Sequence, residues 1–410
     1  MRACKSVSFA ALTFGLVVLL LSTLLPAGGL ASDARHSGTV IRVPQQAPTI
    51  RAAVDRAAPG DTILVSRGIY RESVAVPADK RGITIRGVDR NGVVLDGGDT
   101  RKAAIEVHAD GVALENLSAH NYRGNTFYWE DVKGFRGSYL TVWNVLGYGI
   151  YTEGSTDGVL DHDYVSGAAD AAYYVGECNP CRTTLRNLVA RLSGVGYSGT
   201  NASGGIVIRD SLWDRNAVGI LPNSYANEKK PPQQAALITG NVVVASGRAR
   251  VPLVTPLAGF YGIGIGIAGG NANRIQRNRV TDSLRYGVAV FPTAFWISLD
   301  PRPRPPGKHS PWRPTGNVVR SNTVRGSGVA DLALSAGSGR RNCFASNRSS
   351  TMLPVHLQGA CTRTVRGDTS VSRALTAPLQ TMLERAGRRL RPLPYTAMPV
   401  PPPQPNMPGA

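Results

Sequence analysis

A repeat of 22 to 25 residues in the middle of the chain constrains its fold more than any other feature. Each unit contains short Val/Ile/Leu runs separated by Gly, Asn, Asp or Ser, a pattern typical of short strands and tight turns. One polar residue recurs at the same place in each unit. These positions are Asn116, Ser138, Asp163, Asn187 and Ser211, then, after wider spacings, Asn241, Asn278, Asn322 and Asn347. A unit of this length is about one turn of a parallel β-helix, whose edges stay unpaired until neighbouring turns stack on it.

The units resemble the coils of the pectin-lyase-like right-handed parallel β-helix superfamily over about residues 39–361. Before them, "APTIRAAVDRAAPGDTILVSRGIYRESVAV" contains a short amphipathic pattern around residues 50–58 and a Pro-Gly-Asp turn, similar to the helix that caps the first coil in that superfamily. The resemblance implies an all-β, right-handed parallel β-helix with an N-terminal capping helix. It does not identify the activity, because the superfamily includes lyases, hydrolases, esterases, epimerases and proteins without known catalysis.

The polar residue of each unit has an expected structural use. An Asn side chain at a turn can bond the backbone of its own turn and the amide of the next coil. We therefore expect an Asn ladder that satisfies buried polar groups along the array.

The two ends of the chain differ from the repeats. Residues 1–31 have the features of an export signal: Arg2 and Lys5, an apolar run over 10–25, and small residues before a mature start near Ser32. This predicts a secreted, cell-surface or periplasmic protein; an uncleaved membrane anchor is the alternative reading. Residues 371–391 read as a basic amphipathic helix that packs over the last coil or lies on an acidic surface. The Pro-rich residues 392–410 are expected to be extended and mobile.

Removal of the signal also removes Cys4 and leaves four cysteines, an even number that favours disulfides in an exported chain. Of the three possible connectivities we predict Cys178–Cys181 and Cys343–Cys361. A Cys-x-x-Cys pair can also bind zinc or do redox chemistry. A zinc site requires a second nearby pair, and a redox motif is expected within a βαβ unit.

The chain carries a formal net charge of +19. Such a surface attracts polyanions outside the cell, so we expect an acidic polysaccharide or an anionic cell-wall polymer as partner. The alternative is that the arginines only keep the protein soluble. No common nucleic-acid-binding signature is present, and nucleic acid is not expected as a partner.

Three glutamates fall at nearly equivalent places in consecutive repeats. Glu130 and Glu177 lie 14 residues after their ladder positions and Glu153 lies 15 after its own. Carboxylates about 4.8 Å apart repel, so they bind a cation, raise one another's pKa, or point apart. The first outcome predicts a metal site of Glu130, Glu153 and Glu177, for which Ca²⁺ suits the oxygen ligands; a solvent-facing column of turn residues is the alternative.

The stretch "LDHDYVSGAADAAYYVGEC" contains the candidate catalytic carboxylates. "SGAADAAYYVG" is similar to the pectin methylesterase pattern, with Asp170 at the position of the nucleophile. The second Asp and the Arg phrase of that pattern are missing here, which argues against pectin methylesterase activity. We predict Asp170 and Glu177 as catalytic groups with Asp161 as helper, and a turn-forming role for Asp163.

Long insertions at about 221–235, 248–261 and 291–316 are expected to leave neighbouring coils on one side and form a wall. The last joins aromatic to basic side chains, which suits stacking on sugars and pairing with their acidic groups. The predicted substrate-binding residues are Tyr173, Tyr174, Trp296, Arg302, Arg304 and Trp312. Shielding of an edge, or contact with another protein, is the alternative use of these loops.

These features together predict an exported, monomeric β-helix protein that binds an acidic polysaccharide. Where the protein is catalytic, we expect lyase-like or epimerase-like proton abstraction next to a carboxylate. The alternative is a non-catalytic surface or adhesion protein that uses the β-helix as a rigid scaffold for protein contacts.

Overall fold

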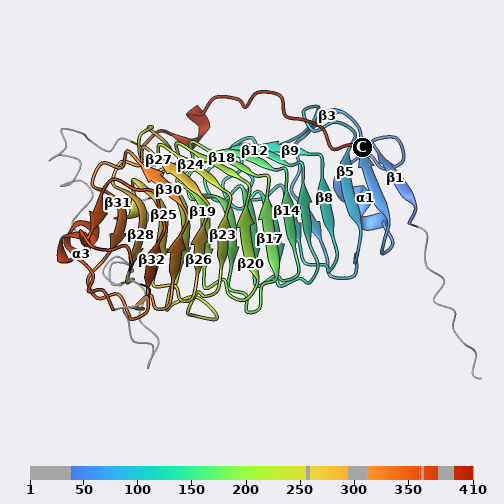
Figure 1. The fold of residues 1–410 in the computed structure, drawn as a ribbon. Helices are drawn as coiled ribbons and strands as arrows, with labels where there is room; N and C mark the ends of the chain where they lie inside the picture. The colour runs from blue at the N-terminus through green and yellow to red at the C-terminus, as the bar shows by residue number, and fades with distance from the viewer. Residues whose placement is uncertain are drawn as a thin grey trace, which may run out of the picture. The chain divides into compact units, whose positions relative to one another are not determined.

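Each repeat folds into three short strands, and equivalent strands of successive repeats pair in parallel to form three long sheets (Figure 1). The structure is a computed structural model that describes residues 38–254, 259–293, 312–359, 361, 364–376 and 392–409. The proposed signal 1–31, the insertion residues Trp296, Arg302 and Arg304, and the predicted helix beyond residue 376 lie outside the described residues.

Sheet A lies first in each coil and its strands pair in chain order. It contains β1 (Val40–Val43), β2 (Thr62–Val65), β5 (Thr84–Gly87), β8 (Ala113–Glu115), β11 (Arg136–Ser138), β14 (Val159–Asp161), β17 (Thr183–Arg186), β20 (Ile206–Arg209), β23 (Leu237–Thr239), β26 (Arg274–Gln276), β29 (Val318–Arg320) and β32 (Cys343–Ala345).

Sheet B follows sheet A across a tight turn. It contains β3 (Gly68–Tyr70), β6 (Val93–Asp96), β9 (Ser118–His120), β12 (Thr141–Val145), β15 (Tyr164–Ala168), β18 (Val189–Arg191), β21 (Leu212–Asp214), β24 (Val242–Val244), β27 (Arg279–Thr281) and β30 (Thr323–Arg325).

Sheet C closes each coil and bears the candidate site. It contains β4 (Val74–Val76), β7 (Ile105–Val107), β10 (Phe127–Glu130), β13 (Ile150–Glu153), β16 (Ala171–Gly176), β19 (Val195–Thr200), β22 (Val218–Asn223), β25 (Ile263–Ala268), β28 (Tyr286–Phe291), β31 (Ala330–Leu334) and β33 (Met352–Leu353). The predicted right-handed parallel β-helix is confirmed by this topology.

The interior consists of apolar side chains that stack coil on coil. Alternate residues of a strand point to opposite faces, so one apolar residue per strand repeats along the inside of a sheet. In sheet A the column is Ile63, Ile85, Leu114, Gly137, Leu160, Leu185, Ile208, Ile238, Ile275, Val319 and Phe344. Every side chain in this column is fully buried. The hydrophobic periodicity of the repeats thus accounts for the core.

The expected Asn ladder runs along the turn between sheets A and B in the later coils. The backbone N–H and Nδ2 of Asn278 both donate to Oδ1 of Asn322, at 2.9 and 3.0 Å. Asn241 and Asn322 make the same bonds to the next ladder residue, and each ladder Nδ2 also donates to a carbonyl of the preceding coil. A second ladder, through Asn273, Asn317 and Asn342 at another corner, was not predicted.

Asp163 replaces Asn in the first ladder and leaves it incomplete. Its Oδ1 accepts the Leu140 N–H at 2.8 Å, while its buried Oδ2 has no hydrogen-bond partner. Burial raises the pKa of Asp163 from 3.8 to about 7, although the Leu140 N–H and the Arg90 charge lower it. A carboxyl at this position is therefore held in the protonated form more strongly by the folded chain than by the unfolded chain.

We expect Asp163→Asn to flatten the pH dependence of stability. Because the folded-state pKa lies above the unfolded value, the unfolding free energy should fall as pH rises from about 4 to about 7. The amide does not ionise and supplies a donor, so the variant should be more stable than the wild type at pH 8 by about 1–3 kcal/mol. Urea unfolding at pH 5 and pH 8 measures the difference in unfolding free energy between the variant and the wild type. The same difference at both pH values would contradict the raised pKa of Asp163.

A short helix covers the start of the array. Helix α1 (Ile50–Arg56) begins after Thr49, whose side chain accepts the Ala52 N–H at 3.0 Å. It buries Ile50, Ala53 and Val54 against the first coil. The predicted N-terminal capping helix is therefore present.

At the other end, helix α3 (Thr369–Thr376) buries Val371 and Leu375 in an apolar cluster with residues of sheet C. Both predicted disulfides, Cys178–Cys181 and Cys343–Cys361, are present. Among the described residues, no helix has both the length and the apolar character needed to cross a bilayer.

The Pro-rich C-terminal segment, predicted to be mobile, is bound to the β-helix along residues 392–409, which include η2 (Tyr395–Ala397; Figure 1). Asn406 Oδ1 accepts the Arg90 N–H at 2.6 Å, and the Met407 N–H donates to Asn116 Oδ1 at 2.9 Å. Met398 packs over Gly167, where an added Cβ would lie 2.6 Å from Met398 Cγ. The prediction failed because these partners are 230 or more residues away in the chain.

Candidate functional site

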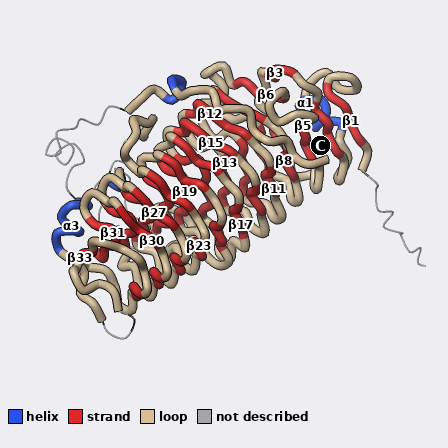
Figure 2. The backbone as a smooth tube through the Cα atoms, turned by 45° about the horizontal axis from the view of Figure 1, so that its top comes forward, coloured by secondary structure: helices blue, strands red, loops and turns tan. Residues whose placement is uncertain are grey.

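The outer face of sheet C is covered over its later strands and open over its earlier ones. Leu221, Ala289 and Ala333 lie on this face and are fully buried in an apolar cluster with Phe260 and helix α3. The earlier strands β7, β10 and β13 instead present Glu106, Glu130 and Glu153, which are partly exposed, and β16 follows them with all of its residues buried. We call the outer side of these four strands the open half. Figure 2 shows how the strands of successive coils stack in rows along the β-helix. The open half, next to the apolar cluster that covers the later strands, is therefore the candidate place for a ligand to lie against sheet C.

Tyrosines form a column along the open half. Strand register places Tyr128, Tyr151 and Tyr174 on three successive coils, and Tyr148 joins them from the preceding turn. The Tyr151 and Tyr174 rings stack at 4.4 Å with an interplanar angle of 10°, and the Tyr148 ring lies 4.6 Å from Tyr151. We call these four residues the tyrosine cluster. Tyr128, Tyr151 and Tyr174 are only 4–9% exposed, so a ligand on this surface meets the rim of the cluster and not the ring faces.

Carboxylates accept from three of these hydroxyls. The Tyr151 hydroxyl donates to Glu153 Oε2 at 2.9 Å, and Tyr128 hydrogen-bonds Glu130. Tyr148 hydrogen-bonds Asp170. Burial, the first cause, together with these carboxylates raises the pKa of each tyrosine, so the hydroxyls remain protonated donors at neutral pH.

Asp170 has the most suitable environment for proton transfer. It lies at the corner between β15 and β16 and is half-buried. Burial raises the pKa of Asp170 to about 6, and the Tyr148 hydrogen bond offsets part of that increase. A carboxylate with a pKa just below neutral is a base at physiological pH and stays strong enough to accept a proton.

The predicted glutamate column is right for two residues and wrong for the third. Glu130 and Glu153 are direct partners across β10 and β13. The partner of Glu153 on β16 is Gly176, and Glu177 comes one residue later with φ 57°. A shift of one residue turns a side chain to the other face of a strand, so the three carboxylates do not share one column.

Glu177 instead faces the insertion that follows β22. Its Oε2 accepts the Lys229 N–H at 3.1 Å, and it hydrogen-bonds Glu228. Burial, followed by this second carboxyl, raises the pKa of Glu177 above its usual range, which indicates a shared proton. Lys229 Nζ lies 3.6 Å from Glu153 Oε1 and so places a cation on the open half.

Asp170 and Glu177 are not placed as an acid and base pair. The six-residue strand β16 lies between them and spans about 20 Å, whereas paired carboxyls in glycoside chemistry stand about 5–9.5 Å apart. Their side chains also have different partners, Tyr148 for one and Glu228 for the other. Asp170 therefore remains as the single candidate base.

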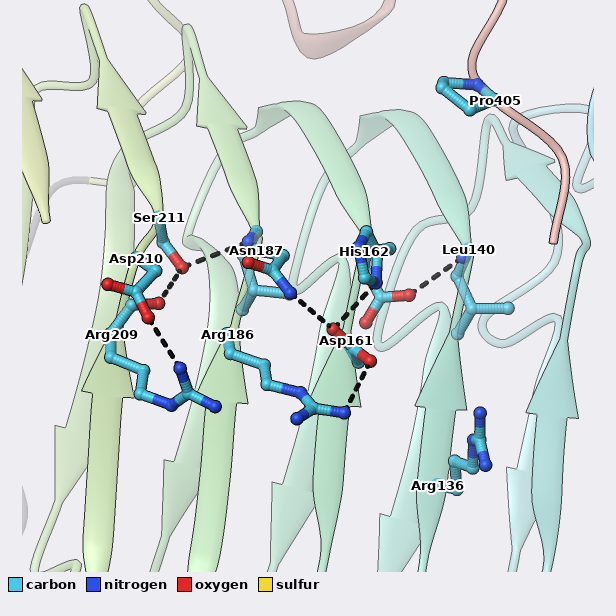
Figure 3. Close-up of polar contacts among 12 residues, drawn as sticks. Arg136, Leu140, Asp161, His162, Arg186, Asn187, Arg209, Asp210, Ser211 and Pro405 are labelled. Atoms are coloured by element: carbon cyan, nitrogen blue, oxygen red, sulfur yellow. Dashed lines mark hydrogen bonds and ion pairs between the residues drawn. The ribbon is translucent and has the colours of Figure 1, made fainter. Parts of the chain in front are cut away.

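Asp161 lies at the turn between sheets A and B, where Figure 3 shows it beside Arg186, Asn187 and His162. It is 6% exposed, accepts from Arg186 Nη2 at 2.9 Å and Asn187 Nδ2 at 3.1 Å, and lies 2.8 Å from His162 Nδ1. Strand β15 separates it from Asp170. These contacts correct the predicted helper role: Asp161 is a structural ion-pair residue.

The predicted substrate-binding residues are dispersed. Tyr173 is fully buried in the core, one residue out of phase with Tyr174, so only Tyr174 belongs to the open half. Trp312 is half-buried, and its backbone N–H donates to Thr293 Oγ1 at 3.0 Å, beyond β28. The expected single wall is also corrected, because the 248–261 insertion follows a strand of sheet B while the other two follow sheet C.

One candidate metal cluster lies on the open half. Among the described residues, Glu106, His108 and Glu130 are the single group of three whose ligand atoms all lie within 4.8 Å of one another. His108 Nε2 lies 3.3 Å from Glu106 Oε1, and His108 Nδ1 lies 3.4 Å from Glu130 Oε2. Of the predicted metal ligands, only Glu130 belongs to this group. Carboxylate and imidazole together suit zinc or a similar transition metal better than the all-oxygen shell of Ca²⁺.

Sequence reasoning missed Tyr148, Glu228 and the pair Glu106 and His108. In the sequence Tyr148 is one aromatic of the stretch "GYGIY" at 147–151, and its contact with Asp170 depends on the three-dimensional turn. Glu228 lies in an insertion outside the repeat, so the repeat spacing could not position it.

Comparisons with known proteins find similar solved structures but no similar sequence. No protein-family profile matches the chain, and no curated protein sequence matches it. Similar solved structures include the A-module of mannuronan C-5 epimerase AlgE6 from Azotobacter vinelandii (15% identity, 74% of this chain and 86% of that one, TM-score 0.43). Others are the catalytic domain of a GH87 α-1,3-glucanase bound to nigerose (12%, 77% and 68%, 0.45) and the GH136 lacto-N-biosidase from Eubacterium ramulus (14%, 75% and 62%, 0.48). At these identities the likeness concerns architecture.

Proposed function

We propose that the open half of sheet C binds a polysaccharide and that Asp170 acts there as a general base. The observation that carries the proposal is the environment of Asp170: half-buried, with a pKa of about 6, and hydrogen-bonded to Tyr148 within the tyrosine cluster. The hydroxyls and carboxylates of the open half are suited to bind sugar hydroxyl groups.

The proposed reaction is β-elimination at a uronate unit of the polymer. Epimerisation is the related reaction that begins with the same proton abstraction but breaks no glycosidic bond. Asp170 takes the proton from the carbon next to the sugar carboxylate. The electron pair forms a carbon–carbon double bond as the neighbouring glycosidic bond breaks, and the leaving oxygen receives the Tyr148 proton. Tyr148 is placed for this step because it lies beside Asp170, and burial raises its pKa, so its hydroxyl still carries a proton at neutral pH.

The open half is acidic, so an acidic polysaccharide needs a cation there. Lys229 supplies one positive charge beside Glu153. A metal held by Glu106, His108 and Glu130 would supply another and would neutralise a sugar carboxylate close to the tyrosine cluster. We therefore propose that the substrate is an acidic polysaccharide and that its binding to the open half depends on a cation. Ca²⁺ and Zn²⁺ are the ions to compare.

Activity should depend on pH through Asp170. A base with a pKa of about 6 is ionised above that value, so kcat/KM should rise as pH increases through about 6. In Tyr148→Phe the carboxylate loses the hydrogen bond that lowers its pKa, so the rise should move to higher pH. The pH profiles of the two proteins measure this shift; coincident profiles would assign the titration to another group.

The test is incubation of the mature protein with acidic and neutral polysaccharides, each with Ca²⁺, Zn²⁺ or EDTA. Unsaturated-product absorbance detects elimination, and exchange of solvent deuterium into the sugar detects epimerisation. Cation-dependent product from a uronate polymer supports the proposal. Binding at the open half without product would favour a carbohydrate-binding protein, and neither binding nor product would favour the scaffold reading.

A further inference from the structure

A pocket of about 500 Å³ lies at the corner between sheets A and B in the later coils, on strands other than those of the open half. Three successive coils build it. The first contributes Arg277 and Arg279, the second Ser321 and Thr323, and the third Ser346 and Arg348, with the ladder residues Asn278 and Asn322 at its base. The hollow arises because the middle coil has small side chains where its neighbour has arginines.

The strand register sets the spacing of the arginines. Arg279 on β27 is the direct partner of Thr323 on β30, and Thr323 is in turn bridged to Arg348. Two strand spacings therefore separate Arg279 from Arg348, about 9.6 Å. Arg277 lies two residues before Arg279, at the turn. The pocket is thus a small polar recess with guanidinium groups on both sides.

These arginines differ from those of the earlier coils in having no carboxylate partner. In the earlier coils, Arg186 pairs with Asp161 and Arg209 with Asp210, at 2.9 and 2.6 Å (Figure 3). Arg191 pairs with Asp214 at 2.8 Å. Among the described residues, no hydrogen bond or ion pair engages the side chains of Arg277, Arg279 or Arg348, all of which are exposed.

The local composition explains the difference. Residues 259–293 and 312–359 contain ten arginines and two acidic residues, Asp282 and Asp331. Asp331 is 1% exposed and accepts from backbone N–H groups, so it does not neutralise this surface. The later coils therefore carry uncompensated positive charge around a preformed recess, and such a charge distribution attracts anions.

We propose that this arginine pocket binds the anionic groups of an acidic polysaccharide. A guanidinium offers paired N–H donors that match the two oxygens of a carboxylate or sulfate, and the Ser and Thr hydroxyls of the middle coil can bond sugar hydroxyls. Anionic groups spaced along a polymer can engage Arg279 and Arg348 together. The site is independent of the chemistry proposed at Asp170 and would hold the polymer on a different surface of the β-helix.

The test compares two triple variants that each remove three positive charges. Arg277→Gln/Arg279→Gln/Arg348→Gln removes the pocket cations, and Arg191→Gln/Arg209→Gln/Arg215→Gln removes three ion-paired arginines of earlier coils. Thermal unfolding and circular dichroism confirm that both are folded. The probes for calorimetric binding are tetragalacturonate and a dextran sulfate oligosaccharide, with maltotetraose as the neutral control and single-stranded DNA as a competing polyanion.

In EDTA, where the open half lacks the cation that it needs, the pocket variant should bind the acidic oligosaccharides at least tenfold more weakly, about 1.4 kcal/mol, while the matched variant stays within about twofold of wild type. A preference for one probe identifies the anionic group as carboxylate or sulfate. Equal losses in the two variants, or no loss in either, would overturn the proposal, as would equally tight binding of single-stranded DNA. Asp170→Asn should leave this binding unchanged, so failure of the catalytic proposal is distinguishable from failure of this one.

Discussion

Asp170→Asn is expected to lower kcat/KM for the polysaccharide by about 10²–10⁴-fold, the usual contribution of a general base. The amide has nearly the same shape and can still accept from the Tyr148 hydroxyl, but it cannot take a proton. Binding of the polysaccharide should persist, because the tyrosine cluster and the neighbouring carboxylates are unchanged. Steady-state kinetics and direct binding measured on the same preparation separate the two effects.

The matched control is Asp210→Asn, which makes the same chemical change on the other side of the coil. Asp210 pairs with Arg209 at 2.6 Å, its side chain is 50% exposed, and its φ of 51° is tolerated by Asn. Activity in this variant should be that of the wild type. If Asp170→Asn retains more than about one tenth of wild-type activity, Asp170 is not the base.

Trp213→Ala is expected to destabilise the β-helix by about 3–5 kcal/mol, the range for loss of a buried aromatic side chain. Trp213 is fully buried, and its ring meets Tyr173 at 5.9 Å and Tyr197 at 6.5 Å, both edge-on. Its Nε1 also donates to Asn241 Oδ1 at 3.2 Å, so truncation leaves a cavity and removes a bond from the Asn ladder. Urea unfolding followed by tryptophan fluorescence and circular dichroism measures the loss.

Trp213→Phe separates the two contributions. Phenylalanine fills much of the cavity but does not donate to Asn241, so its cost should be clearly smaller than that of Trp213→Ala. Because each coil contacts only its neighbours, the loss is expected to appear first as unfolding of the coils around β21. Equal stability of Trp213→Ala and wild type would contradict the stacked interior described above.

The fold was predictable because it depends on a repeated local pattern. The spacing of Asn241, Asn278, Asn322 and Asn347 marks the turn in successive coils, and the structure joins these residues in one ladder. Apolar alternation within each unit likewise predicts the inward columns. Such features require agreement only between neighbouring repeats, which a sequence shows directly.

The candidate site was predictable only in part, because a site depends on register and on insertions. Glu130 and Glu153 are 23 residues apart, and so are Glu153 and its partner Gly176, so Glu177 lies one residue out of line. Strand alternation likewise places Tyr173 in the core and Tyr174 on the other face. The roles of Tyr148 and Glu228 come from a corner and a long insertion, where the repeat gives no alignment. The net charge of the sequence shows that the whole chain is basic. It does not show that the open half is acidic.

The most direct test of the central claim is a crystal structure of Asp170→Asn bound to the polysaccharide fragment that gives product with the wild type. We predict that the sugar chain lies across the outer side of β10, β13 and β16, with the sugar carbon that loses its proton facing residue 170 and its leaving oxygen near the Tyr148 hydroxyl. A chain bound on sheet A or sheet B, with the open half of sheet C empty, would contradict the account.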